Sequence, residues 1–192
     1  MSLGDLLRER TDTIVERWVE TVLSSYSSEA AVLFQRQQDP FANPIGKTVR
    51  AGTRGTFQTI LNGMDTEELR SHLDEIIRVR AVQELSPSEA LSFVFSLRSV
   101  VRKVIPEMDA DSRLHREVAE FDEKIDRVAL VAFDLYAERR EEVSQLRIKE
   151  VKRQVAWVFE KMNQRDAEAL EARNNPDQGA VASDHVERED LR

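Results

Sequence analysis

The chain has no cysteine among its 192 residues. Disulfides, thiolate catalysis, zinc–thiolate centres and iron–sulfur clusters held by protein thiols are therefore excluded. The sequence also lacks a basic, apolar leader and any run of about 18 apolar residues, the length that a membrane-spanning helix requires. These absences predict a cytoplasmic protein that does not insert into a membrane.

The motifs of common enzymes are absent as well. No Gly-x-Ser-x-Gly, phosphate-binding loop or dinucleotide fingerprint occurs, and the three histidines lack the spacing of metal ligands. We therefore predict no enzyme activity, no catalytic residue, no metal and no cofactor. The net charge of −8 disfavours nucleic acid as a partner, which leaves proteins and small molecules.

Glycine and proline are scarce, with 6 and 5 residues, and neither occurs between Glu107 and Asn175. A very long final helix, from about residue 112 to 169, is therefore predicted. Upstream, apolar residues at helical spacing predict helices over residues 3–24 and 44–61, one that starts after an Asp65 cap, and one from 86 to 105. The fold is predicted to be all-α, with a long C-terminal helix that extends like a coiled coil.

One stretch joins a proline-bounded loop to a strong helix start. Asn43 is expected to accept hydrogen bonds from unpaired backbone N–H groups, and Pro44 suits the first helical position, where its missing N–H costs nothing. Phe41 is expected to cover the core or a dimer interface. The residues of this motif are Asp39, Pro40, Phe41, Ala42, Asn43, Pro44, Ile45 and Gly46.

Three glycines, Gly46, Gly52 and Gly55, fall within the helix predicted over 44–61. Each weakens a helix by about 1 kcal/mol relative to alanine. We expect another helix to approach closely there, in preference to a ligand that touches the bare backbone.

A second helix start is the capping box of Ser86, Pro87 and Glu89. Just before it, Arg80 occupies the next position of an apolar stripe, so its guanidinium is expected to be buried and to need a partner. Arg78 lies two residues before it in the sequence, and Arg98 lies on the helix that is predicted to follow. Ion pairs are favoured for these three arginines, and a site for an anionic ligand stays an alternative.

The long final helix carries a heptad pattern from Leu114 to Leu135, with steps of four and three. The pattern slips between Arg139 and Leu146, as in a coiled-coil stutter, and resumes at Val151. We expect this helix to present a dimer or partner surface, since its length exceeds that of a core domain. The residues predicted for that surface are Leu135, Val143, Leu146, Val151, Val155, Trp157, Val158 and Met162.

Three regions are predicted along the chain. Residues 1–145 form a helical core domain, residues 146–170 form a coiled-coil-like extension, and residues 171–192 form a flexible polar tail.

Two motifs in order carry a resemblance to a known family. The stretch from Asp39 to Gly46, and Ile77-Arg78-Val79-Arg80-Ala81-Val82-Gln83 running into Ser86-Pro87-Ser88-Glu89-Ala90, resemble the RsbRD N-terminal domain family over residues 3–140. The resemblance implies a globin-like domain without haem, the sensory half of RsbR-type stressosome proteins, which are co-antagonists with respect to the kinase RsbT. It also implies a homodimer whose terminal helices lead into a signalling linker.

Those proteins carry a STAS domain after the linker, whereas this sequence continues into a short polar tail. A stand-alone sensor or adaptor that acts on a protein partner through its C-terminal helix is therefore expected. The alternative is a carrier of an apolar or anionic small molecule. Its pocket would be lined by Phe57, Phe93, Phe95 and Arg80.

Overall fold

The computed structural model describes residues 1–25, 43–83, 85–106 and 111–174, and these residues form six α-helices, one short 3-10 helix and no strand. The predicted all-α fold with a long C-terminal helix is confirmed. The chain divides into two units, Met1–Val143 and Ser144–Arg192. The expected boundary stood at residue 145.

The first two helices replace the single helix predicted over 3–24. Helix α1 spans Leu3–Glu9 and α2 spans Thr11–Ser24, with a break at Arg10, whose φ and ψ are −103° and 16°. At the break the Arg10 guanidinium donates a hydrogen bond to the carbonyl of Val104 on another helix. The prediction of one helix over residues 3–24 is therefore wrong at Arg10, and apolar periodicity does not encode the contact with Val104 that accompanies the break.

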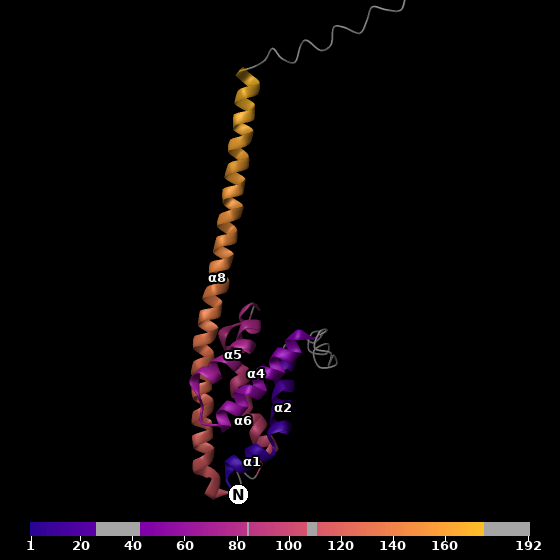
Figure 1. Ribbon diagram of the computed structural model, residues 1–192, viewed down its shortest axis with the longest axis vertical. Helices are drawn as coiled ribbons and strands as arrows, with labels where there is room; N and C mark the ends of the chain where they lie inside the picture. Colours follow the sequence, from indigo (N-terminus) through magenta and orange to yellow (C-terminus); the bar gives the residue numbers. More distant parts are fainter. Residues whose placement is uncertain (26–42, 84, 107–110, 175–192) are drawn as a thin grey trace, which may run out of the picture. The chain divides into compact units, whose positions relative to one another are not determined.

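Helix α4 (Pro44–Leu61) packs on α5 (Thr66–Ala81) (Figure 1). Gly52 and Gly55, in the middle of α4, face α5. A Cβ atom at Gly52 would lie 2.8 Å from the carbonyl oxygen of His72, and one at Gly55 would lie 2.3 Å from the His72 ring. Both distances are shorter than any van der Waals contact. The glycines therefore permit a close helix–helix approach, as expected.

Helix α6 (Pro87–Val104) packs against α2. The indole Nε1 of Trp18 donates a 2.8 Å hydrogen bond to the carbonyl of Phe93, and the two rings stack with centroids 6.2 Å apart. Trp18 is completely buried, so its polar edge needs this acceptor.

A 3-10 turn, η1 (Ser112–Leu114), leads into α8 (His115–Asn174), a single helix of 60 residues. Up to Val143, the heptad positions of α8 pack into the first unit's own core. Leu135 is only 3% exposed. Its prediction as part of a dimer or partner surface is corrected, because intramolecular packing covers it. The buried heptad residues are Leu114, Phe121, Ile125, Val128, Ala132 and Leu135.

Cationic side chains close the carboxyl ends of three helices in the first unit, and the Arg10 bond to Val104 is the one at the end of α6. Arg8 and Lys124 donate to the carbonyls of Leu61 and Ile60 at the end of α4, each at 3.3 Å. Arg140 donates to the carbonyl of Ala81 at the end of α5, at 3.1 Å. A cation at this end also offsets the negative pole of the helix dipole.

The second unit contains the rest of α8, from Ser144 to Asn174. Wherever its side chains are described, they are exposed to solvent. None of the described helices is both long enough and apolar enough to cross a bilayer.

Candidate interaction surface

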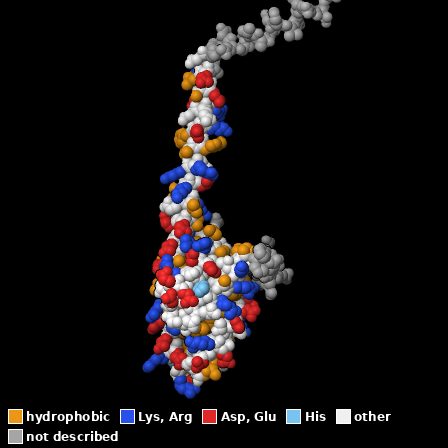
Figure 2. Space-filling view, viewed as in Figure 1, with side chains coloured by type: hydrophobic (Ala, Val, Ile, Leu, Met, Phe, Trp, Pro, Cys, Tyr) orange, Lys and Arg blue, Asp and Glu red, His pale blue; other side chains and the backbone are white. Residues whose placement is uncertain are grey.

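The exposed apolar side chains of the second unit are not scattered at random. Five of them follow α8 with steps of three, four, three and four residues, and each is 44–57% exposed. Such steps place side chains on one face of a helix. This face is the α8 seam, and its residues are Ile148, Val151, Val155, Val158 and Met162. Figure 2 shows apolar side chains among charged ones along this part of the chain.

Ile148 was absent from the predicted surface, although it stands one heptad step before Val151. A row of exposed apolar side chains on one face of a helix is a candidate interaction site.

Leu146 and Trp157, two predicted members of the surface, lie elsewhere on the helix. Trp157 follows Val155 by two residues, which is about 200° around the helix axis. Both side chains are exposed, Leu146 by 65% and Trp157 by 59%. Lys161, one turn further on, places its ammonium 5.0 Å from the centre of the Trp157 ring. The predicted surface thus splits into the α8 seam and a second face.

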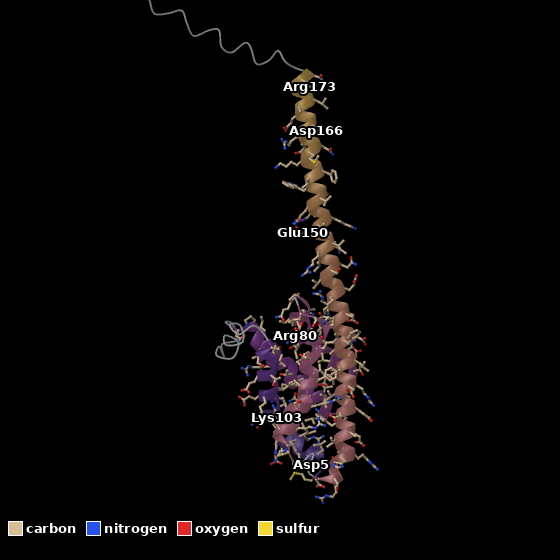
Figure 3. The ribbon with its side chains drawn as sticks, turned by 180° about the vertical axis from the view of Figure 1, so that it is seen from behind. Asp5, Arg80, Lys103, Glu150, Asp166 and Arg173 are labelled. Carbon is tan, nitrogen blue, oxygen red and sulfur yellow. The ribbon has the colours of Figure 1, made fainter. Side chains whose placement is uncertain are left out.

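The polar side chains beside the α8 seam partly satisfy one another within the helix. Glu150 accepts hydrogen bonds from Arg153 at 2.9 Å and from Gln154 at 3.0 Å. The Arg153 bond, and then the Gln154 bond, hold the pKa of the Glu150 carboxyl below its ordinary value. Glu150, Asp166 and Arg173 lie along this part of α8 (Figure 3).

In the first unit, the predicted stutter begins at an ion-pair network between α5 and α8. The guanidinium of Arg139 lies 2.6 Å from Asp74 on α5 and 2.7 Å from Glu142 on its own helix. Arg78 approaches the other oxygen of Asp74 at 2.9 Å. Val143, the last predicted surface residue in this unit, is half-buried. We call Arg139, Asp74, Arg78 and Glu142 the α5–α8 clamp.

The clamp keeps Asp74 ionised. Burial by itself would raise the pKa of Asp74, but the hydrogen bonds and charges of Arg139 and Arg78 outweigh burial and lower it. The hydrogen bond to Asp74, followed by that to Glu142, raises the pKa of Arg139. Both side chains are less than a quarter exposed, so water screens their attraction only in part.

Arg80, the buried arginine, ties three helices together inside the first unit (Figure 3). Its Nε donates to the carbonyl of Ala90 at 2.7 Å, its Nη2 to that of Glu89 at 2.9 Å, and its Nη1 to the hydroxyl of Ser25 at 3.0 Å. The guanidinium also lies 5.5 Å from the centre of the Phe93 ring. These contacts satisfy a cation whose burial would otherwise be costly.

Arg98 joins α6 to α8 through acidic partners. Its Nε lies 3.2 Å from Asp122, its Nη2 contacts Asp126, and Arg102 reaches the other oxygen of Asp122 at 2.9 Å. The structure therefore places each of the three predicted arginines in contacts within the chain.

The predicted helix starts are made by side-chain caps. Asn43 accepts a 2.7 Å hydrogen bond from the N–H of Gly46, and a Cβ at Gly46 would lie 2.3 Å from the Asn43 amide. Glycine there leaves room for the cap. Ser86 and Glu89 form the predicted capping box, with Pro87 in the first turn. Asp39, Pro40 and Phe41 lie outside the described residues.

The pocket expected for a small-molecule carrier does not form as predicted. Phe57 and Phe93 are buried in the core, and Phe95 is 47% exposed on the outside of α6. Instead, a cavity of about 490 Å³ lies along α2, lined by Glu16, Glu20 and Arg50 among others. Within the described residues, no group of three or more His, Cys, Asp or Glu side chains is placed to hold a metal.

The described residues thus define an all-α domain with a row of exposed apolar side chains along the last part of one long helix. The family described as "RsbT co-antagonist protein rsbRD N-terminal domain" matches residues 12–151, and the chain belongs to this family. Its members are regulatory domains associated with the stressosome, and they work in protein complexes. The resemblance carried by the two sequence motifs is confirmed. No curated protein and no solved structure matches the chain.

Proposed function

We propose that this chain is a non-enzymatic sensory module that forms a homodimer through the α8 seam and transmits a stimulus through α8 to a protein partner. The observation that carries the proposal is the α8 seam itself, five apolar side chains at heptad spacing in a unit where every described side chain is exposed. Family membership supports the regulatory role. A cytoplasmic location is part of the same proposal.

The size of the α8 seam fits a reversible association. Complete burial of a Val, Ile or Met side chain stabilises by about 1.5–3 kcal/mol, and these side chains are already about half covered by their own helix. A partner would then add about 1 kcal/mol per side chain, or roughly 10 kcal/mol over both copies. Association costs about 4–15 kcal/mol. The balance supports a weak dimer that a signal can shift.

The route for a stimulus is α8, because one helix contributes to both units. In the first unit, the α5–α8 clamp holds the last turns before Val143 to α5. A ligand or partner that changes the packing of α5 would act on the clamp and so on the helix. Such coupling requires two states with different affinities for the stimulus.

The test is sedimentation velocity of the full chain at 1 to 100 μM (roughly the range in which a marginal interface associates). The wild type should gain mass with concentration, and Val155→Glu should stay a monomer, because the new carboxylate would be buried in the interface. Ala156→Glu is the matched control, since it adds the same charge to the next, exposed residue. A wild type that remains a monomer throughout, or a control as disruptive as Val155→Glu, would refute the proposal.

A further inference from the structure

The α8 seam also carries information about how a second copy would lie on it. This inference rests on the proposed homodimer. With Ile148, Val155 and Met162 as the a positions of a heptad, Val151 and Val158 are d positions, and Arg165 is the next d. Each of these side chains is exposed. A facing helix would therefore find five consecutive apolar layers and then one arginine layer.

The pattern ends toward the first unit, where the preceding a positions are Glu141 and Asp134. Two such carboxylates would face each other in a symmetric pair, and like charges opposite one another are unfavourable. The pairing surface is therefore confined to the second unit, from Ile148 onward.

The residues beside the α8 seam favour one orientation. In a parallel pair, a g residue faces the e residue five positions later on the other helix. Lys161 would thus face Asp166, and Glu168 would face Arg173, with each pair occurring twice by symmetry. Asp166 and Glu168 have no ion-pair partner in the described part of their own chain, so both carboxylates are available.

In the heptad nearest the first unit, the charges beside the α8 seam repel instead of attracting each other. There, the parallel g-to-e pair is Arg147 with Lys152, two cations that have no ion-pair partner among the described residues. Their repulsion destabilises the first turns of the pair.

We infer that a second copy of the chain docks on the α8 seam in parallel and in register, closed at its far end by the Lys161–Asp166 and Glu168–Arg173 pairs and loosened at its near end by Arg147 against Lys152. The two paired α8 helices are then held more strongly at the far end than at the near end. The near end follows the boundary at Val143, so a small change in the first unit would affect the pairing most there.

The antiparallel alternative is poorer in apolar contact. Its best register sets Val155 against Val158, which places Ile148 opposite Arg165 twice and loses the Ile148 layer. Only the pair Arg147 with Glu168 is gained. A third helix would enclose the Arg165 layer more tightly, with three cations around one axis, and so two copies are favoured.

The absence of native cysteine makes disulfide trapping a direct test of orientation. Val151→Cys should form a disulfide-linked dimer rapidly under mild oxidation, because a parallel pair brings equivalent core positions within about 6 Å. In the antiparallel register, the two copies of residue 151 would lie about 16 Å apart, eleven residues along the axis. Ala156→Cys, on the outside of the pair, is the control and should react slowly.

The outcomes separate this inference from the proposed function. A dimer by sedimentation in which Val151→Cys does not crosslink, while a mixture of Val151→Cys and Met162→Cys does, overturns the parallel orientation and leaves the homodimer standing. A trimeric mass overturns the two-copy arrangement. A monomeric wild type overturns both the proposed function and this inference.

A second measurement tests the near and far ends through charge. Lys152→Glu should tighten the dimer by roughly three- to tenfold, since it converts two repulsive pairs into attractive ones. Lys149→Glu makes the same change in net charge at an exposed position outside the pairs, and it should alter the dissociation constant less than about twofold. Asp166→Lys should weaken the dimer, and adding Lys161→Glu should restore it. Equal effects of Lys152→Glu and Lys149→Glu would refute the pairing scheme.

Discussion

Helix α8 offers two stretches of similar spacing with opposite environments. From Leu114 to Leu135, six of the seven heptad side chains are almost completely buried, whereas the residues of the α8 seam are about half exposed. Both stretches show alternating steps of four and three. A heptad pattern therefore indicates that one face of a helix is packed against a partner. It does not indicate whether that partner belongs to the same chain or to another one.

The largest expected difference between the two units concerns their two tryptophans. Trp18→Ala should reduce the free energy of unfolding by about 3–5 kcal/mol, because the residue is fully buried and its indole donates to Phe93. Trp157→Ala should leave the stability of the first unit unchanged, since Trp157 is 59% exposed on the second unit. Urea denaturation of both variants at low concentration checks this. Similar losses of unfolding free energy in the two variants would contradict the difference between the two units.

A second contrast uses two arginines. Arg80→Ala should cost about 3 kcal/mol, because it removes three hydrogen bonds and leaves a void where a fully buried side chain stood. Arg153→Ala, on a side chain that is 79% exposed, should be nearly neutral. Arg80→Lys separates charge from geometry, since an ammonium cannot reach all three acceptors at once. The measurement is again the urea midpoint, and an Arg80→Lys variant as stable as wild type would contradict the geometric role.

A third prediction concerns the pH dependence of the α5–α8 clamp. Asp74→Asn should reduce stability by about 1–2 kcal/mol at pH 7, because the pair with Arg139 is only partly exposed. The pKa of Asp74 is lowered in the folded state, so its contribution is complete above the unfolded-state value of about 4 and is lost as the pH falls through the lower folded-state pKa.

Thermal denaturation between about pH 2 and pH 7 distinguishes the two proteins. The wild type should lose stability more steeply below about pH 4 than Asp74→Asn does. If both proteins lose stability equally steeply as the pH falls, the carboxylate of Asp74 is not the titrating group. Glu75→Gln, at the next, exposed position of α5, is the matched neutralisation.

The smallest expected effect tests the close approach of α4 and α5. Gly55→Ala gains about 1 kcal/mol of helix propensity but forces the His72 ring to move, for a net loss of about 1 kcal/mol. His72 is 31% exposed, so the ring has room to yield. Combining Gly55→Ala with His72→Ala should remove the clash and recover the propensity gain. A double-mutant cycle by urea denaturation gives the coupling, and additivity would show that the two residues do not interact.

The parts of this fold that follow local rules were predictable from sequence. The starts of α4 and α6 depend on Asn43 and Ser86, whose caps act within three residues, and the structure has both. The break at Arg10 was not predictable, because it accompanies a contact with Val104, distant in sequence. Likewise, Arg80 could be recognised as buried, whereas its carbonyl and hydroxyl acceptors come from helices whose arrangement the sequence does not reveal.

For the candidate surface, periodicity identified the α8 seam from Val151 to Met162 but also selected Leu135, which is buried. The difference lies in what covers each stretch of α8. The first unit supplies apolar side chains against Leu135, and a pattern read along one helix contains no information about its neighbours.

The cationic caps of the first unit have a consequence for how the chain folds. Arg8 and Leu61 are 53 residues apart, and Arg10 and Val104 are 94 apart. At the amino end of α1, the backbone N–H of Leu3 likewise donates to the Glu117 carboxylate across 114 residues. Contacts of such sequence separation require closure of long loops, while the helices themselves form from neighbours. We therefore expect the helix ends to remain open in the folding transition state. Replacing these side chains should accelerate unfolding and leave the refolding rate almost unchanged, as a pair of chevron plots would show.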